Sequence, residues 1–350
     1  MRVRSIPGHE VRALRPPPAA TRSAVAALRR FLRTQPAGAA AAALADPEQP
    51  LAVAFSGGAD STALLLAALR VWPQRAVHAL HVHHGLQAAA DAFAQHARAR
   101  CAAWDVSCHV LSVQVRRARG DSLEEQARLM RHAALARAAR ELGCAWLLLG
   151  HHADDQAESL LLALLRGAGP AGLAAMPPAA QRAGVWLGRP LLECPAPRLR
   201  AELDAAGVPY VRDPMNEDPA LRRGRIRAEL LPVLDRLEPA WRRTLGRSAA
   251  LCAQAAGHVR EQAARDLRVC RGEAGLRLAQ LAAWETPRRA QVLRAWLAEL
   301  GLRSNAAQID NLLRQIDAPG DAAVLVGIGH ARLWRDSGWL RCDPGASAAL

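Results

Sequence analysis

Short apolar runs alternate with longer amphipathic stretches over the first half of the chain. The apolar runs predict strands at 51–55, 76–82, 108–113 and 145–149. The stretches between and after them predict helices near 60–71, 88–104, 122–142 and 153–166. Strands separated by helix-length segments are typical of βαβ units, so we expect an α/β fold with a parallel sheet. Ligands of such sheets bind beyond the carboxyl ends of the strands, where the polar clusters at 56–61, 83–87 and 151–158 fall.

The two ends of the chain follow other patterns. Residues 1–48 are rich in Arg, Pro and Ala, and we expect this N-terminal extension to be partly disordered, with one short helix over 24–32. Beyond residue 215 the pattern predicts helices at 240–268, 287–300 and 305–316, and short strands at 323–327 and 331–340. The predicted domains are the extension, an α/β domain over 49–240, and a smaller, mostly helical α+β domain over 241–350.

Length and charge narrow the function. At 350 residues, 51% of them hydrophobic, the chain has room for two or three domains with real cores. Its formal net charge is +14, which favours a polyanionic partner, most simply nucleic acid. All 46 of its Lys and Arg residues are arginine. A GC-rich coding bias explains arginine in place of lysine, but it does not explain why positive charge outnumbers negative.

The cysteine pattern and the lengths of the apolar stretches bear on the cellular compartment of the protein. Seven cysteines are scattered along the chain and none forms a Cys-x-x-Cys motif, which argues against a disulfide framework, a zinc ribbon or an iron–sulfur site. No uncharged apolar stretch reaches membrane-spanning length, and no signal-peptide pattern is visible. We therefore expect a cytoplasmic protein without a membrane partner.

The turn after the first predicted strand has the pattern of a phosphate-binding loop. It reads Ser56, Gly57, Gly58, Ala59, Asp60 and Ser61, and a predicted helix follows directly. Two glycines let backbone approach an anion, and the helix N-terminus offers unpaired N–H groups and the positive end of its dipole. Asp60 either caps the helix or faces a bound Mg²⁺. A Walker A loop needs a lysine and is excluded. The alternative is an ordinary Gly-Gly turn, but the six residues together resemble the pyrophosphate loop of the ATP pyrophosphatases.

A second polar cluster follows the strand predicted at 145–149. His151, Asp155 and Glu158 are spaced so that they share one face of the helix predicted there. Carboxylates at a helix N-terminus can bind Mg²⁺, accept a proton or hold a cationic amine. The alternative is N-terminal capping together with an acidic first turn that suits the helix dipole, which we favour for Asp154 alone. The whole cluster, in a chain with a phosphate loop, favours function.

Two further groups have weaker signals. His81, His83 and His84 suggest a metal hydrolase built with the acids of 151–158, but structural or substrate-lining histidines are the better interpretation. Arg128 and Arg131 share a face of the helix predicted over 122–142, where they either form a solvated salt-bridged face or contact phosphate or ribose.

The motifs together resemble those of the tRNA(Ile)-lysidine synthetases, a family within the PP-loop ATP pyrophosphatase superfamily. The resemblance covers about 50–340. Its residues are the loop 56–61, His81-Val82-His83-His84-Gly85-Leu86, Glu124-Glu125-x-x-Arg128-x-x-Arg131, His151-x-x-Asp154-Asp155-Gln156-x-Glu158, Leu164-Leu165-Arg166-Gly167-x-Gly169, Arg189-Pro190-Leu191-Leu192, Asp213-x-x-Asn216-x-Asp218, Ile226-Arg227-x-x-Leu230-Leu231-Pro232, and 287–297. Mild departures exist: His132 and Ser159 stand where the family usually has Tyr and Thr, and Gly224 where it often has Asn.

This resemblance implies a fold, a reaction and partners. The fold is an adenine nucleotide alpha hydrolase-like (PP-loop) domain followed by a tRNA-binding domain. The reaction uses ATP and Mg²⁺ to adenylate the C2 carbonyl oxygen of cytidine 34 in the CAU anticodon of a tRNA(Ile), after which free L-lysine attacks C2 and displaces AMP to give lysidine. A homodimer is compatible with the resemblance.

The resemblance also assigns residues. The catalytic set is Asp60, Asp155 and Glu158, with Asp60 and Asp155 as the Mg²⁺ candidates. Beside the loop, ATP is expected to contact His151 and Arg131. The expected tRNA contacts are Arg166, Arg223, Arg225, Arg227, Arg288 and Arg289.

Three other functions fit the sequence less well. A sulfur-inserting tRNA enzyme of the same superfamily normally needs catalytic cysteines, and the sequence has no paired set. An amidotransferase-type synthetase would need a glutaminase region, which is not apparent. A non-catalytic RNA-binding protein with a degenerate loop would explain the charge but not the intact acids.

Overall fold

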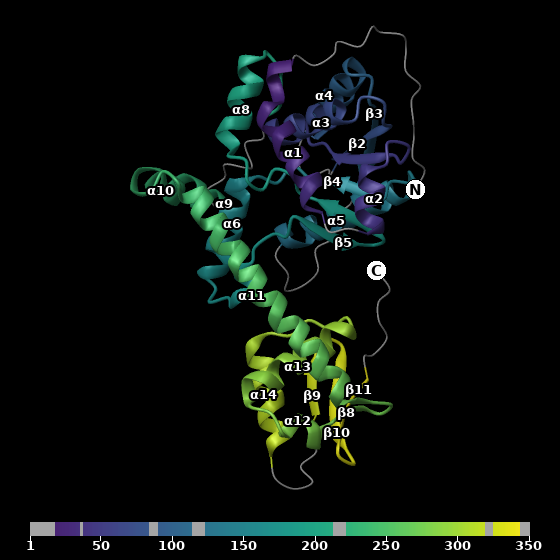
Figure 1. The fold of residues 1–350 in the computed structure, drawn as a ribbon, viewed down its shortest axis with the longest axis vertical. Helices are drawn as coiled ribbons and strands as arrows, with labels where there is room; N and C mark the ends of the chain where they lie inside the picture. The colour runs from purple at the N-terminus through teal and green to yellow at the C-terminus, as the bar shows by residue number, and fades with distance from the viewer. Residues whose placement is uncertain are drawn as a thin grey trace. The chain divides into compact units, whose positions relative to one another are not determined.

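The computed structural model describes residues 18–35, 38–83, 90–113, 123–212, 222–318 and 325–343 (Figure 1). It divides into two compact units, Met1–Leu251 and Cys252–Leu350. The division falls inside helix α11 (Trp241–Cys270). The expected disorder of 1–17 and the motifs at 84–86 and 213–218 lie outside the described residues. None of the helices in the described part of the chain is long and apolar enough to cross a membrane.

A six-stranded sheet forms the centre of the first unit. Its order is β3-β2-β1-β4-β6-β5. All neighbours are parallel except β5, which is antiparallel to β6. The strands are β1 (Leu51–Ala54), β2 (Val77–His83), β3 (Ser107–Ser112), β4 (Trp146–Leu148), β5 (Ala179–Arg182) and β6 (Val185–Gly188). The predicted parallel sheet is confirmed. The β5–β6 hairpin was not predicted, because its first strand, Ala-Ala-Gln-Arg, carries no apolar run.

Helices cover both faces of this sheet. One face packs against α3 (Ala59–Val71), α4 (Ala90–Ala103), α1 (Arg22–Thr34) and α8 (Ala196–Ala205). The other packs against α5 (Leu123–Glu141). Nine of the thirteen residues of α3 are buried. This burial explains why its sequence is mostly apolar rather than amphipathic.

Part of the N-terminal segment belongs to this core. Helix α1 and the short α2 (Ala39–Ala45) lie within 1–48. Ala24, Leu28 and Phe31, spaced at helical intervals, are buried in α1, and the ring of Phe31 meets Trp146 of β4 edge-on at 5.9 Å. The Arg- and Ala-rich composition obscured this apolar stripe, so the predicted helix over 24–32 was placed outside the α/β domain.

The chain beyond the sheet folds back onto α6 (Ala153–Leu164). Helix α9 (Arg222–Arg225) continues through a π-helical turn (Ile226–Leu230) into α10 (Leu231–Leu237). Leu231 N–H donates to the carbonyl of Ile226, which produces the wider π spacing. Ile226, Leu231 and Trp241 pack on Ala157 and Leu162 of α6. This contact brings Arg227 next to the acids of α6.

The second unit is a smaller α+β domain. Helices α12 (Leu278–Ala282), α13 (Thr286–Glu299) and α14 (Ala306–Asp317) share a core with a five-stranded antiparallel sheet. The sheet order is β7-β8-β11-β10-β9, with β7 (Arg271–Gly272), β8 (Gly275–Arg277), β9 (Leu325–Ile328), β10 (Ala331–Asp336) and β11 (Trp339–Asp343). The strand predicted over 331–340 is instead the hairpin β10–β11, which turns at Ser337 and Gly338, both at positive φ.

Candidate active site

Two loops meet where the chain order of the parallel sheet reverses. On one side of β1 the sheet continues with β2 and β3. On its other side β1 pairs with β4, and the sheet continues from there with β6. The loops after β1 and β4 therefore lie side by side at the carboxyl edge. In open α/β sheets this switch point is where ligands bind.

The loop after β1 has the geometry of an anion cradle. Gly57 has φ +85°, which only glycine adopts without strain, and Val211 N–H donates to its carbonyl at 2.9 Å. The hydroxyl of Ser61 donates to the carbonyl of Gly58 and accepts from Ser56 N–H at 3.2 Å, so Ser61 braces the loop. Helix α3 begins at Ala59 without a side-chain cap. Its first N–H groups are thus available to an anion, as the loop sequence predicted.

Gly150 lets the second loop lie against the first. A Cβ at this position would stand 3.2 Å from the carbonyl carbon of Asp60 and 3.2 Å from the nitrogen of Ser61. Only a residue without a side chain permits this close backbone approach without a shift. It is what brings the start of α6 next to Asp60.

His152 occupies the space between the two acid groups. It is the N-cap of α6: Asp155 N–H donates to its Nδ1 at 3.3 Å, and its own N–H donates to Asp155 Oδ2 at 3.1 Å. Its Nε2 lies 3.5 Å from Asp60 Oδ2 and 3.4 Å from Asp155 Oδ2. Burial lowers the pKa of His152, but the carboxylates of Asp155, Asp60 and Asp154 outweigh it and raise this pKa to about 9.

Arg227 pairs with the acids from the other side. Its guanidinium donates to both oxygens of Glu158, at 2.5 and 2.9 Å, and to Asp155 Oδ1 at 3.2 Å. Glu158 is fully buried. Burial raises the pKa of Glu158 above its usual range in spite of Arg227. Burial also raises that of Asp155, but His152, His151 and Arg227 more than offset it, so the pKa of Asp155 lies below its usual range.

The neighbouring Asp154 joins three helices. Its Oδ2 accepts Ala196 N–H at 2.9 Å at the start of α8, and its Oδ1 accepts Arg242 Nε at 2.8 Å from α11. Arg242 also stacks over Trp241, 4.1 Å from the ring centre, and donates to Asp235. Asp154 lies in the acidic first turn of α6, as expected, but His152 rather than Asp154 is the cap. Asp154 instead positions α6 relative to α8 and α11.

His151 does not share the helical face of Asp155 and Glu158. Helix α6 begins at Ala153, two residues after it. The His151 ring stacks on His132 of α5, with ring centres 6.2 Å apart and planes 8° apart. The one-face prediction therefore holds only for the two acids, because the capping turn starts the helix later than the sequence indicated.

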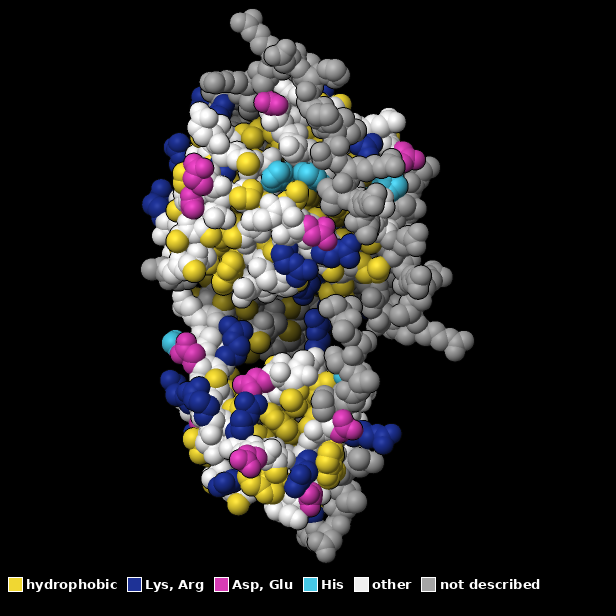
Figure 2. Space-filling view, turned by 90° about the vertical axis from the view of Figure 1, so that its right-hand side faces the viewer, with side chains coloured by type: hydrophobic (Ala, Val, Ile, Leu, Met, Phe, Trp, Pro, Cys, Tyr) yellow, Lys and Arg dark blue, Asp and Glu magenta, His cyan; other side chains and the backbone are white. Residues whose placement is uncertain are grey.

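The arginines predicted to contact ATP or tRNA are scattered. Arg131 and Arg166 are exposed, on α5 and just after α6. Arg225 lies 3.7 Å from Glu229, and Arg223 donates to Ser159 at 3.4 Å. Arg227 is bound to the acids. In the second unit Arg288 pairs with Asp266 and the buried Arg289 with Asp317. Figure 2 shows arginines interspersed with acidic side chains over the face of this unit turned to the viewer.

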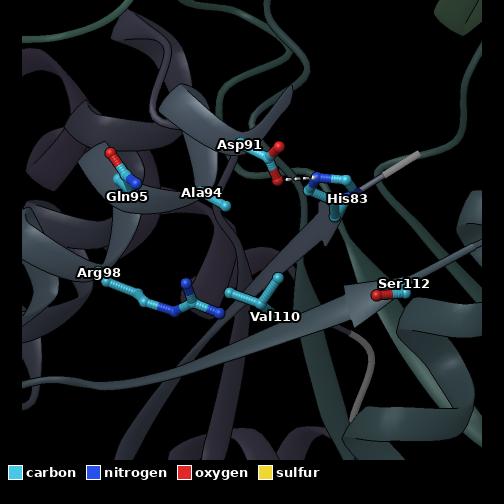
Figure 3. A pocket seen from close by; sticks show the side chains of 7 residues that line it. All are labelled: His83, Asp91, Ala94, Gln95, Arg98, Val110 and Ser112. Carbon is cyan, nitrogen blue, oxygen red and sulfur yellow. Dashed lines mark hydrogen bonds and ion pairs between the residues drawn. The ribbon is translucent and has the colours of Figure 1, made fainter. Parts of the chain in front are cut away.

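The histidines of β2 do not join the acid cluster. His81 is buried, with Nδ1 2.9 Å from the carbonyl oxygen of Phe55. His83 lies 3.0 Å from Asp91 of α4, and Figure 3 shows this contact between two side chains that line a hollow of about 380 Å³, together with Arg98 and Ser112. His84 lies outside the described residues. Among those described, no group of three or more His, Cys, Asp or Glu could hold a metal.

The residues of the loop after β1 fit a nucleoside triphosphate with a divalent cation. Asp60 Oδ1 is buried and has no hydrogen-bond partner. An unpaired buried carboxylate oxygen is costly unless a cation or donor meets it. Mg²⁺ keeps several waters and substrate phosphates as ligands and needs only one or two carboxylates from the protein, which Asp60 and Asp155 can supply.

Sequence reasoning missed His152 and the role of Arg227. Histidine is not a common N-cap residue, so its position gave no signal. Arg227 is 69 residues from Glu158 along the chain, and only the packing of the π-helical turn on α6 brings them together.

The fold and this loop define a nucleotide-binding domain of the PP-loop class. The family model for the PP-loop domain matches residues 29–234, and that for the TilS substrate binding domain matches residues 276–341. The chain belongs to the tRNA(Ile)-lysidine synthase family.

Curated relatives support this membership over nearly the whole chain. A tRNA(Ile)-lysidine synthase of Polaromonas naphthalenivorans is 48% identical over 269 residues, which are 77% of this chain and 81% of the relative. That of Bordetella parapertussis is 39% identical over 94% of this chain and 96% of the relative. The chain spans less of others: the match to the enzyme of Chromobacterium violaceum, at 45% identity, covers 57% of that protein.

A solved structure supports the fold. A U34-tRNA thiolase from Methanococcus maripaludis matches 65% of this chain and 77% of its own with a TM-score of 0.53. The identity is 16%, so the likeness concerns the architecture of the sheet and its helices.

We expect Gly150→Ala to damage the site by displacing the two loops from each other. The added Cβ must move backbone at Asp60 and Ser61, which we expect to lower the free energy of unfolding by about 1–3 kcal/mol and to weaken ATP use. Thermal unfolding and tRNA-dependent pyrophosphate exchange measure the two effects. Gly169→Ala is the control, because a Cβ there meets nothing within 4 Å. Equal behaviour of both variants would show that the close approach is unimportant.

Proposed function

We propose that this protein joins free L-lysine to C2 of cytidine 34 in the CAU anticodon of a tRNA(Ile), through an adenylated tRNA. As a member of its family it is an ATP-using ligase that forms lysidine. One observation carries the assignment of the site: Asp60, in the first turn of a helix whose N-terminus has no side-chain cap, is joined to Asp155 through His152, which contacts both carboxylates. The helix N-terminus is suited to an anion and the two carboxylates to a cation. The reaction needs a site of each kind.

The first step requires stabilisation of the leaving pyrophosphate. The C2 carbonyl oxygen of the cytidine attacks the α-phosphorus of ATP, an O–P bond forms, and pyrophosphate leaves. We assign the β- and γ-phosphates to the loop Ser56, Gly57, Gly58, Ala59, Asp60 and Ser61, whose N–H groups and helix dipole offset the developing charge. Mg²⁺, which we place at Asp60 and Asp155, would supply further charge neutralisation there.

The second step requires a lysine amine at the activated carbon. The amine attacks C2, a C–N bond forms, and AMP leaves with the oxygen. We assign the incoming ammonium to Asp155, because the low pKa of this carboxyl group keeps it negatively charged at neutral pH. The ammonium must lose a proton before its nitrogen can attack C2. Arg227 donates to both oxygens of the fully buried Glu158 but to only one oxygen of Asp155, so we assign Glu158 a supporting role: it holds the guanidinium that orients Asp155.

Binding of tRNA is assigned to arginines. Exposed Arg166 and Arg225 adjoin the acid site along the chain, and the match to the substrate-binding domain model supports a role for the second unit. Arg288 and Arg289 would have to exchange a carboxylate for a phosphate, which keeps the charge-assisted bond but releases Asp266 or Asp317. Such phosphate contacts give affinity rather than sequence recognition. A homodimer stays a prediction.

Labelled lysine tests the function directly. With ATP, Mg²⁺ and a tRNA(Ile) transcript carrying CAU, we expect label to enter the tRNA, and a transcript with U34 to remain unlabelled. Asp60→Asn should reduce tRNA-dependent AMP formation by roughly 10²-fold or more, because charge stabilisation at the phosphates is lost. ATP consumption without lysine incorporation would contradict the proposed reaction, and a folded Asp60→Asn variant with wild-type rates would contradict the role of Asp60.

Asp155→Asn separates the two steps. The amide retains the shape of the side chain but loses the charge that holds an ammonium, so we expect the KM for lysine to rise roughly 10- to 100-fold. Quench-flow should then show pyrophosphate release preceding lysine incorporation. Asp154→Asn is the matched control, because it removes the same charge from the same turn of α6. Parallel loss of both steps in Asp155→Asn would mean that this carboxylate serves only the metal.

A further inference from the structure

A second polar cluster lies beside the acid site, on the other side of His151. β4 and β6 are paired neighbours, and Leu149 N–H donates to the carbonyl of Gly188 at 2.8 Å. His151 follows β4 and Arg189 follows β6, so both emerge at the carboxyl edge of the sheet. His132 of α5 stacks on His151. The two stacked rings and Arg189 thus lie near the ligand-binding edge, close enough for Arg189 to influence the charge of both rings.

The bonding of these groups is incomplete. Arg189 is 9% exposed, and its Nη1 donates to the carbonyl of Pro177 at 2.9 Å. Its Nε is buried without a partner, and so is Nδ1 of His151. Within the described part of the chain no acidic side chain forms an ion pair with Arg189. Buried polar atoms are normally paired, so the unpaired N–H of Arg189 beside the unpaired ring nitrogen of His151 indicates a ligand that accepts a hydrogen bond from Arg189.

The electrostatics of the cluster agree with an anionic ligand. Burial, together with Arg128 and Arg182, lowers the pKa of Arg189 to about 10. Burial, then His151 and Arg189, lowers the pKa of His132 to about 3. Both residues are therefore in an environment that penalises positive charge, and an anion would relieve this. Burial lowers the pKa of His151 to about 4, and both the negative Asp155 and the positive Arg189 act on this ring.

We propose that Arg189 and His151 bind the carboxylate of the amino-acid substrate while Asp155 holds its amine. This inference rests on the proposed function. The guanidinium fork matches a planar carboxylate, and the loop 56–61 already provides for phosphate. The burial of Arg189 favours a small ligand over a nucleic-acid backbone. Asp155 is negative and Arg189 is positive, and both act on His151. Such a pair of groups suits a ligand with a charge at each end.

This arrangement would set the specificity for lysine. A carboxylate fixed at Arg189 distinguishes the amine next to it from the amine four methylenes away. It would also exclude diamines, which resemble lysine at the reactive end but lack the carboxylate. Arg189 is then a specificity-determining residue, and it should affect the amino-acid step more than the adenylation step.

The test compares lysine with cadaverine, the diamine that lacks the carboxylate, and with lysinamide. We expect the wild-type enzyme to use lysine at least tenfold better than either. In Arg189→Gln the KM for lysine should rise roughly 10- to 100-fold, while the rate with cadaverine and tRNA-dependent pyrophosphate exchange change little. Arg189→Lys should restore part of the preference. Arg182→Gln, which removes an exposed positive charge nearby on β5, is the matched control.

The outcomes separate this inference from the proposed function. Equal use of lysine and lysinamide by the wild-type enzyme would overturn it, and this result needs no variant. Equal losses with lysine and cadaverine in a folded Arg189→Gln would also overturn it, since Arg189 would then serve structure or the nucleotide. Failure of the wild-type enzyme to attach lysine at all would instead overturn the proposed function.

Discussion

The ion pair between Arg227 and Glu158 is the interaction on which the site depends. Glu158 is fully buried in α6, where an unpaired carboxylate would be strongly destabilising. Arg227 meets both of its oxygens and reaches on to Asp155. One guanidinium from a π-helical turn thereby fixes two acids of a different segment. Breaking such a buried pair typically costs about 3–5 kcal/mol.

The rest of the site is arranged around the acids that this pair holds. Asp155 binds the capping His152, whose ring reaches Asp60, so a chain of alternating charges runs from Arg227 to the phosphate loop. Gly150 permits the short distance between the two loops, and Asp154 attaches the same helix to α8 and α11 through Ala196 and Arg242. The position of α6 therefore couples the anion-binding and cation-binding halves of the reaction.

Much of this could be predicted from the sequence, and the limits have physical causes. The βαβ alternation, the Gly-Gly loop and the two carboxylates on one helical face are local patterns, and local patterns are visible in one sequence. The pairing of Arg227 with Glu158 and of Arg242 with Asp154 depends on tertiary packing across 69 and 88 residues. The capping by His152 and the core role of α1 were missed because residue type and composition, taken alone, favoured other interpretations.

A double-mutant cycle tests the central claim most directly. The free energy of unfolding is measured by urea for the full chain, for Arg227→Met, for Glu158→Gln, and for both changes together. If the pair holds the site, each single change should destabilise the fold, because Arg227→Met leaves the buried Glu158 without its partner and Glu158→Gln leaves Arg227 with Asp155 as its remaining carboxylate. The double variant should then be more stable than the sum of the single effects predicts, by at least about 1 kcal/mol. Additive effects would contradict the account.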